Sequence, residues 1–353
     1  MSPSPSPPAS PPSAASPSSA GKWAGRLAVV AVVALLAAVL IGVLGAGGSA
    51  APRGDGDGLA VGRRDVTFVD PSRPTAAAPE EEVEAQPDRT LDTVVLYPTA
   101  NTEATSESTD VRPAGPAAAE GPFPLVVFSH GNGGDPELYV PLVEPLVREG
   151  YVVALPRFPL TSLSGEALAD VVNQPADVSF VIDQLLGLSD RPDGWLAGRL
   201  DADRIAAAGH SLGAVTTLAL AYDGCCIDPR VDAALAVSGV GVPLGPGTLD
   251  DPPPTPLLLV HGAEDGTVPV TGSDDLFARA TGPAYYLRLD EGDHTDIGFG
   301  PDGDLTREAM SAFLDAELDD DPEPLTELPD DVADSGRGEW QERNVPAPAG
   351  AAG

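Results

Sequence analysis

The chain has 353 residues and carries 54 acidic against 19 basic side chains, so its formal net charge is −35. Such an acidic surface repels the phosphate backbone, and we expect no nucleic-acid partner. Only two cysteines are present, which excludes a disulfide-rich scaffold. The length is enough for one large domain with flanking segments.

The N-terminal part of the chain predicts a membrane anchor. Residues 1–26 are rich in Pro, Ser and Ala and are predicted to form a disordered cytoplasmic tail. An uncharged apolar run follows at 27–47, and as a helix of about 1.5 Å per residue it is long enough to cross a bilayer core. We expect a single-pass protein of the cell membrane, with the part of the chain after the apolar run outside the cytoplasm. Small residues at 48–51 leave open a cleaved signal sequence and secretion, and a buried core helix is a third alternative.

Three further segments follow this apolar run. Residues 48–90 are rich in Pro, Gly and acidic side chains and are predicted to form a disordered stalk. Residues 319–353 have a similar composition and are predicted to form a disordered acidic tail. Between them, residues 91–318 contain short apolar runs that alternate with longer helical stretches. This pattern predicts an α/β fold with a mostly parallel central sheet and helices on both faces.

The most informative motif is Gly-His-Ser-Leu-Gly at 209–213. An apolar run ends in it and a second one, at 214–221, begins at once, which predicts a strand, a sharp turn and a helix. In this context G-x-S-x-G is typical of a nucleophilic serine, here Ser211. The flanking glycines let the strand and the helix approach closely, and the helix N-terminus favours a developing negative charge. The alternative is an ordinary serine N-cap.

An acid and a base follow the serine in chain order. A serine hydroxyl is a weak nucleophile until a histidine removes its proton and a carboxylate orients that histidine. Asp265 comes directly after the apolar run 256–262, and His294 follows the run 284–289. Ligand-facing residues collect at such strand ends. We therefore predict a catalytic triad of Ser211, Asp265 and His294.

Other acidic and histidine residues compete for these roles. Asp293 and Asp296 are alternative acids, but Asp293 is adjacent to His294, and neighbouring side chains on one loop usually diverge. No pair of histidines has the H-E-x-x-H spacing of a metal site, so we expect neither a metal nor another cofactor. The remaining histidines end apolar runs and are predicted to hydrogen-bond neighbouring loops: His130, His210 and His261.

Acyl transfer also needs two N–H donors for the oxyanion. The backbone N–H of Leu212, directly after the nucleophile, is the first candidate. The second is Asn132, in the sequence His-Gly-Asn-Gly-Gly that follows the apolar run 124–129. The alternative for this second segment is a plain glycine-rich turn.

Residues from about 91 to 316 resemble α/β-hydrolases of the dienelactone hydrolase and platelet-activating-factor acetylhydrolase-like group, which includes polyester hydrolases related to cutinase. The segments similar to this group are Thr-Val-Val-Leu-Tyr-Pro at 93–98, the strand and loop at 121–134, the strand at 150–156 and the helix at 175–186. The resemblance implies the α/β-hydrolase fold and hydrolysis of a small-molecule or polymeric ester through an acyl-enzyme.

The chain departs from dienelactone hydrolases proper at the nucleophile. They use a cysteine where this chain has Ser211, so the esterase branch is favoured and a lactone substrate is not implied. A serine peptidase or acyltransferase on the same fold is one alternative. A non-catalytic surface binding domain is another, because a fold by itself does not determine function.

The two cysteines, Cys225 and Cys226, are adjacent in the sequence. Neighbouring residues can be bridged only through a strained ring. We therefore expect two small buried apolar residues after the helix that follows Ser211; the sharp turn at Ser211 is called the elbow below. The alternative is a vicinal disulfide, which would fit an oxidising location.

Overall fold

The structure, a computed structural model, describes residues 58–78, 83–99, 121–162, 167–245, 253–300 and 302–345. These residues form a nine-stranded sheet with the order β1-β2-β4-β3-β5-β6-β7-β8-β9. The strands are β1 (Ala60–Asp70), β2 (Arg89–Thr99), β3 (Phe123–Ser129), β4 (Val152–Arg157), β5 (Leu200–His210), β6 (Ala233–Val237), β7 (Leu257–Gly262), β8 (Ala284–Leu289) and β9 (Gly338–Arg343). Neighbours from β4 to β8 pair in parallel, whereas the β1–β2, β2–β4 and β8–β9 pairs are antiparallel.

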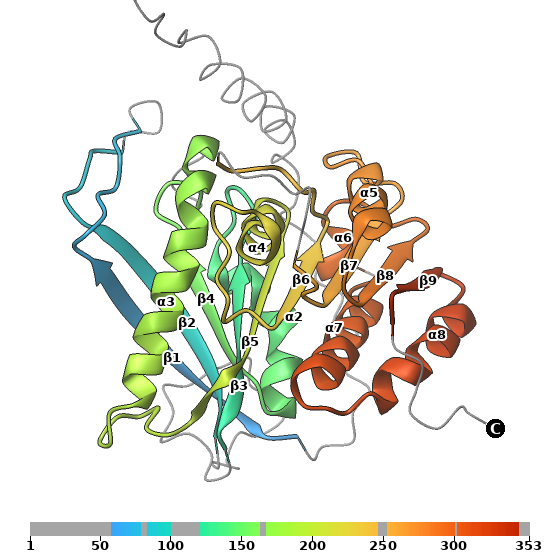
Figure 1. The fold of residues 1–353 in the computed structure, drawn as a ribbon, viewed down its shortest axis with the longest axis horizontal. Coiled ribbons are helices and arrows are strands. Elements are labelled where there is room, and N and C mark those ends of the chain that lie inside the picture. Colours follow the sequence, from blue (N-terminus) through green and yellow to red (C-terminus); the bar gives the residue numbers. More distant parts are fainter. Residues whose placement is uncertain are drawn as a thin grey trace, which may run out of the picture.

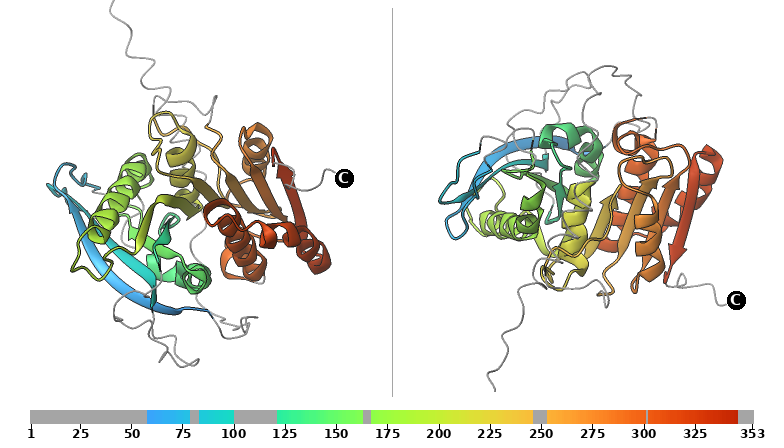
Figure 2. Two further views of the ribbon diagram at one scale, coloured as in Figure 1. Left: turned by 60° about the horizontal axis from the view of Figure 1, so that its bottom comes forward. Right: turned by 90° about the horizontal axis from the view of Figure 1, so that it is seen from above.

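Helices cover both faces of this sheet (Figures 1 and 2). They are α2 (Pro136–Glu149), α3 (Gln174–Ser189), α4 (Leu212–Tyr222), α5 (Thr271–Arg279), α6 (Asp296–Phe299), α7 (Gly303–Leu318), α8 (Glu323–Ser335) and the 3-10 helix η3 (Leu168–Asn173). Apolar residues of α2, α7 and α8 share one core with one face of the sheet, and α3, α4 and α5 pack on the other face. The predicted mostly parallel sheet between two helical layers is confirmed.

The central strands are apolar along their whole length because both of their faces are covered. Every residue of β3, β6 and β7 is buried. Alternate side chains of β3 enter different cores: Val126 and Phe128 lie on the α2 side, and Leu125 and Val127 on the α3 side. The carboxyl ends of these strands therefore form one rigid edge.

The stalk predicted over 48–90 is wrong for residues 60–70 and 89–90, which lie in strands, whereas residues 48–57 and 79–82 lie outside the described residues. Residues 60–70 form β1, an edge strand that pairs along its whole length with β2, from Ala60 opposite Thr99 to Asp70 opposite Arg89. Its inward side chain Phe68 lies in the α3-side core. An edge strand exposes much of its polar surface, so its composition resembles that of a linker.

The disordered tail predicted over 319–353 is wrong for residues 323–343, which form α8 and β9. Leu325, Leu328 and Val332 lie on one face of α8 and are buried in the core that α7 shares. Gly336 ends the helix in the left-handed conformation, with φ of 61°, and β9 then pairs with β8. Because acidic residues occupy the exposed face of α8, the average composition of the segment is that of a polar tail although one face is apolar.

The predicted tail at 1–26 and the predicted membrane span at 27–47 lie outside the described residues. Among the helices of the described part, none combines the length and the hydropathy needed to cross a bilayer. The membrane anchor therefore stays a prediction.

A buried ion cluster fastens β2 to η3 and α3. The Arg89 side chain is 1% exposed, and its guanidinium lies 2.6 Å from a carboxylate oxygen of Asp170 and 2.6 Å from one of Asp177. Arg73, after β1, makes a second ion pair with Asp177 at 2.8 Å. The cluster thus joins the antiparallel edge of the sheet to the helical segment that packs beside α4.

Replacement of Arg89 by leucine should leave two buried carboxylates without their main partner. We expect the free energy of unfolding to fall by about 3–5 kcal/mol, the usual cost of removing one partner from a buried ion pair. Chemical denaturation of the Arg89→Leu variant measures this loss. The control is Arg148→Gln, which removes an exposed ion pair with Glu144 and should change stability by no more than about 0.5 kcal/mol. Equal effects of the two substitutions would contradict the structural role of the cluster.

Candidate active site

Ser211 occupies a sharp turn between β5 and α4. Its φ of 57° and ψ of −118° are unusual for a residue with a side chain, and such a conformation costs about 1–3 kcal/mol. A Cβ on Gly213 would lie 2.0 Å from the carbonyl oxygen of Ser129, and one on Gly209 would lie 2.4 Å from the Gly213 carbonyl. Both glycines are therefore required by close backbone approach, and the predicted strand–turn–helix is confirmed.

The structure brings Ser211, His294 and Asp265 into one hydrogen-bonded chain. His294 Nε2 lies 2.9 Å from Ser211 Oγ, and His294 Nδ1 lies 2.7 Å from Asp265 Oδ2. An ionised carboxylate only accepts hydrogen bonds, so Nδ1 carries the proton and Nε2 is free to accept from the serine hydroxyl. The three residues follow β5, β8 and β7, whose carboxyl ends lie at the same edge of the sheet.

Asp265 is surrounded by hydrogen-bond donors. Its Oδ1 accepts from the backbone N–H groups of Thr267 at 2.8 Å and Val268 at 2.7 Å. Its Oδ2 faces His261 Nε2 at 3.1 Å in addition to His294. Burial alone would raise the pKa of Asp265, but the hydrogen bonds from His261 and His294 outweigh it and hold the pKa well below its usual range. The carboxylate is therefore charged at neutral pH and keeps the proton of His294 on Nδ1.

His261 supports this carboxylate, a role that the sequence pattern did not reveal. Its Nε2 also lies 3.0 Å from the carbonyl oxygen of Val268, and its Nδ1 lies 2.7 Å from Ser273 Oγ. Because the carbonyl and carboxylate oxygens can only accept, Nε2 carries the proton. His261 was predicted to hydrogen-bond a neighbouring loop, and it does so. The four-residue spacing to Asp265 across the end of β7 is the only sequence signal for the contact.

The alternative acid Asp293 points into its own loop. Its Oδ1 accepts from the backbone N–H of Thr295 at 2.8 Å, so it stabilises the turn after His294. The side chain of Asp296 lies outside the part that the structure describes. Among the described carboxylates, Asp265 is the one that contacts His294 Nδ1.

The loop after β3 approaches the serine closely. A Cβ placed on Gly131 would lie 3.2 Å from the Ser211 Cβ, so a side chain there would require a small shift of one of the two residues. Two N–H groups of this loop hold it together: Gly133 donates to the Thr161 carbonyl at 2.8 Å, and Gly134 to the Gly131 carbonyl at 3.0 Å. The loop is thus a fixed element of the site.

The two predicted oxyanion donors lie on either side of this contact. Leu212 is the first residue of α4, where backbone N–H groups have no partner within the helix. Asn132 lies between the loop glycines. Within the described residues, neither of these two N–H groups donates to a protein acceptor. They remain available to an oxygen of a bound substrate, although their role stays a prediction.

The adjacent cysteines lie away from the site, in the turn after α4. Cys225 and Cys226 are joined by a disulfide, and Cys225 is exposed, so the expectation of two buried thiols is wrong and the vicinal alternative is correct. Asp223 lies beside them, but its carboxylate accepts the backbone N–H groups of Cys225 and Leu244. In the disulfide state this group offers no thiolate to a metal ion.

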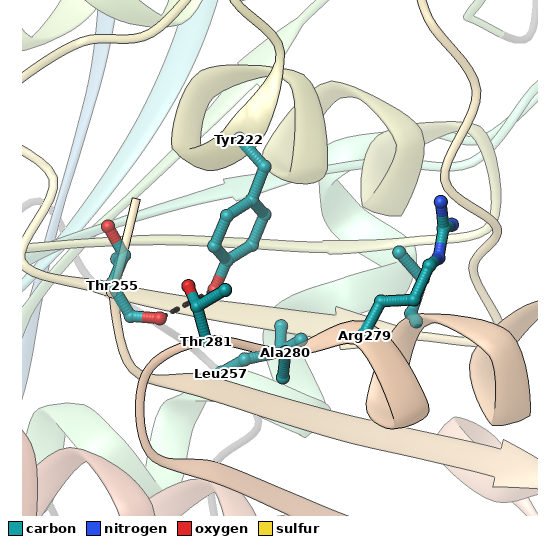
Figure 3. Close-up of a pocket in the computed structure, with 7 residues that line it drawn as sticks. Tyr222, Thr255, Leu257, Arg279, Ala280 and Thr281 are labelled. Carbon is teal, nitrogen blue, oxygen red and sulfur yellow. Dashed lines mark hydrogen bonds between the residues drawn. The ribbon is translucent and has the colours of Figure 1, made fainter. Parts of the chain in front are cut away.

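A small pocket at the other end of α4 lacks candidate catalytic groups. It has a volume of about 30 Å³ and lies between the end of α4 and the end of α5 (Figure 3). Tyr222, the last residue of α4, donates its hydroxyl to the Thr255 carbonyl at 2.8 Å there. Since Ser211 lies at the start of the same helix, this pocket is separate from the hydrogen-bonded chain.

Comparisons with known proteins identify the family of the chain. Residues 126–349 match the alpha/beta hydrolase family, and residues 89–162 match platelet-activating factor acetylhydrolase, isoform II. The predicted resemblance to α/β-hydrolases of this group is confirmed.

Individual relatives share low sequence identity with this chain or match only a short part of it. The uncharacterized protein YfhR of Escherichia coli O157:H7 is 22% identical over 223 residues, which cover 57% of this chain and 74% of that protein. YfhR of Salmonella typhimurium is 35% identical over 65 residues, which cover 18% of this chain and 22% of that protein. A solved structure of ferulic acid esterase from Streptomyces cinnamoneus aligns with a TM-score of 0.58 at 23% identity, covering 78% of this chain and 94% of that one. At this identity the match supports the fold.

Replacement of Gly213 by alanine should disrupt the elbow. The new methyl group would collide with the backbone of β3, and we expect a loss of about 3 kcal/mol in unfolding free energy. Denaturation measures this, with Gly187→Ala as the matched control. A Cβ on Gly187, in α3, meets no atom within 4 Å, so that variant should be stabilised by about 0.5 kcal/mol or more. A neutral Gly213→Ala variant would refute the close contact.

Because two histidines are buried in their neutral form, we expect the protein to lose stability in mild acid. Burial lowers the pKa of His130 to about 4 and that of His210 to about 3, so both stay neutral in the folded state. The unfolded state takes up these protons below pH of about 6.5. Stability is therefore complete above that pH and falls below it, by about 2 kcal/mol per histidine at pH ~5.

Denaturation curves of wild type and His130→Gln between pH ~7.5 and ~5 isolate the contribution of this ring, because carboxylates whose pKa burial raises, such as Glu149 and Glu317, affect both proteins alike. His130→Gln removes one of the two groups, so its stability should fall by about 2 kcal/mol less than that of wild type over this window. An unchanged pH dependence in this variant would contradict the assignment.

Proposed function

The chain belongs to the alpha/beta hydrolase family, and from this premise we propose that it hydrolyses carboxylic esters through an acyl-enzyme on Ser211. The observation that carries the proposal is the hydrogen-bonded chain from Ser211 through His294 to the charged Asp265. The match to platelet-activating factor acetylhydrolase and the fold shared with a ferulic acid esterase support an ester as the substrate class.

In the proposed first step, Ser211 Oγ attacks the carbonyl carbon of the ester while its proton passes to His294 Nε2. The carbonyl oxygen becomes negative and accepts hydrogen bonds from the N–H groups of Leu212 and Asn132. Collapse of the tetrahedral intermediate breaks the bond to the alcohol. His294 gives its proton to the departing alkoxide, and the acyl group stays on Ser211.

In the second step, water replaces the alcohol. His294 Nε2 takes a proton from this water, and the hydroxide adds to the acyl carbonyl. The carboxylic acid leaves and the proton returns to Ser211 Oγ. Asp265 remains charged throughout, orients the ring of His294 and stabilises the imidazolium that forms in each step.

We also propose that the apolar segment 27–47 attaches the enzyme to the cell membrane, with the catalytic domain outside the cytoplasm. The support is the length and the lack of charge of this segment in the sequence. Membrane fractionation followed by N-terminal sequencing tests it. A mature chain that starts near residue 51 in the soluble fraction would replace the anchor by a cleaved signal sequence.

Ester hydrolysis is tested with 4-nitrophenyl acetate and with a fluorophosphonate probe that labels activated serines. Wild type should turn over the ester and take up the probe. Ser211→Ala should lower kcat by ~10⁴-fold or more and abolish labelling, and His294→Ala should slow both by a similar factor.

The control is Ser179→Ala, which removes a serine hydroxyl in α3 that donates to Asp228. This variant should keep both activities. Turnover of peptide amides with no ester hydrolysis would shift the assignment to a peptidase. Absence of labelling in folded wild type would refute an activated serine.

A further inference from the structure

Two residues outside the Ser211–His294–Asp265 chain connect the loops that surround it. His210 Nε2 lies 2.9 Å from the backbone carbonyl oxygen of His294. His210 Nδ1 lies 3.0 Å from the hydroxyl of Tyr139, which in turn lies 3.0 Å from the backbone N–H of Gly131. Tyr139 and His210 are 4% and 5% exposed, so these contacts form in the interior, where an unpaired polar group is costly.

The chemistry of the partners determines the direction of every hydrogen bond. The His294 carbonyl can only accept, so His210 Nε2 carries the proton. Burial lowers the pKa of His210 to about 3, which keeps the ring neutral and leaves Nδ1 as an acceptor. Tyr139 therefore donates its hydroxyl to Nδ1 and accepts from the Gly131 N–H. One continuous chain runs from Gly131 through Tyr139 and His210 to the His294 backbone.

This chain joins three separate parts of the site. Gly131 belongs to the loop that carries Asn132, His210 directly precedes Ser211, and His294 follows β8. The carbonyl of His294 accepts a second hydrogen bond from Ser238 Oγ at 3.2 Å, so the backbone of the base is held from two sides. The relative position of base, nucleophile and oxyanion loop therefore depends on these side chains.

Phe299 packs against the pair. Its ring centroid lies 5.2 Å from that of Tyr139 and 6.2 Å from that of His210, both in edge-to-face contact. The Phe299 side chain remains 45% exposed, so it separates the pair from solvent on that side. Hydrogen bonds in such a low-dielectric surrounding are stronger than in water.

We propose that Tyr139 and His210 are positioning residues, which hold the oxyanion loop and the backbone of His294 in register with Ser211. Neither residue hydrogen-bonds the Ser211 hydroxyl or a ring nitrogen of His294. The His210 ring packs against the His294 ring with 5.0 Å between centroids, and the hydrogen bonds of the pair reach Gly131 and the His294 backbone. The inference rests on the proposed function only for the experiments that measure catalysis. Its prediction is a loss of kcat with little change of KM, because the reacting groups are misplaced while substrate contacts persist.

Two near-isosteric substitutions separate the two hydrogen bonds of His210. The amide nitrogen of glutamine reaches the position of Nε2, so His210→Gln keeps the bond to the His294 carbonyl. The amide oxygen of asparagine reaches the position of Nδ1, so His210→Asn keeps only the bond from Tyr139. We expect His210→Asn to lower kcat by ~30-fold and His210→Gln by no more than ~3-fold, with KM within about twofold of wild type. Tyr139→Phe should lower kcat by ~10-fold.

The experiment uses the full chain and compares the thermal midpoint, kcat and KM for 4-nitrophenyl acetate, and the rate constant of Ser211 labelling by the fluorophosphonate. A merely structural role would lower the midpoint of His210→Asn and His210→Gln alike and leave their kcat values equal. Equal kcat values would overturn the proposal. A difference in both kcat and labelling rate between the two variants supports it.

A readout that needs no activity separates this inference from the proposed function. Nitrogen-15 NMR of histidine-labelled wild type should show His210 as a neutral ring with the proton on Nε2 down to pH ~5. A proton on Nδ1, or protonation of this ring above that pH, would overturn the positioning role. If wild type hydrolyses no ester but is labelled at Ser211, and His210→Asn slows that labelling, the ester assignment fails and the positioning role stands.

Discussion

The site depends on one close backbone contact, that of Gly213 with the end of β3. Only a hydrogen fits between the Gly213 Cα and the Ser129 carbonyl, and this lets α4 begin directly behind the strand edge. Ser211 is then forced into its positive φ, with its hydroxyl presented at the start of a helix whose residues are all buried. A nucleophile held between a central strand and a buried helix has little freedom to move. The other groups of the site must therefore be positioned around it.

The parallel sheet brings these groups to it. Strands β3, β5, β7 and β8 end at one edge, and the segments that follow them supply Asn132, Ser211, Asp265 and His294. Asp265 stays ionised because two backbone N–H groups and two imidazole rings stabilise it, whereas burial keeps His130 and His210 neutral. Other acidic side chains are exposed, among them Glu327, Asp330 and Asp331 of α8.

The sequence predicted the elements whose signal is local. Apolar runs marked the fully buried strands, and Gly-His-Ser-Leu-Gly marked the elbow, because its close contacts require glycine at two fixed positions. The sequence-based prediction of disorder was wrong at the two ends of the domain. The strands β1 and β9 lie at the sheet edges, and α8 buries only a narrow stripe, so each has the composition of a polar linker. These elements are ordered because they pair with other strands or pack on the shared core, and the composition of a segment does not reveal such partners.

By itself, the sequence determined the α/β-hydrolase architecture, the strand–turn–helix around Ser211, and the chain order of Ser211, Asp265 and His294 after successive strands. The tertiary structure decided which groups meet. Asp265 and His294 are 29 residues apart in the sequence, and His294 and Ser211 are 83 apart, yet their side chains are in hydrogen-bond contact. The register of the parallel strands brings the loops that carry them together. The same register places His261 beside Asp265, and the packing of α2 on the sheet places Tyr139 against His210. Side-chain contacts of this kind depend on the packing of whole layers, so the sequence pattern could suggest some of them but could not establish their geometry.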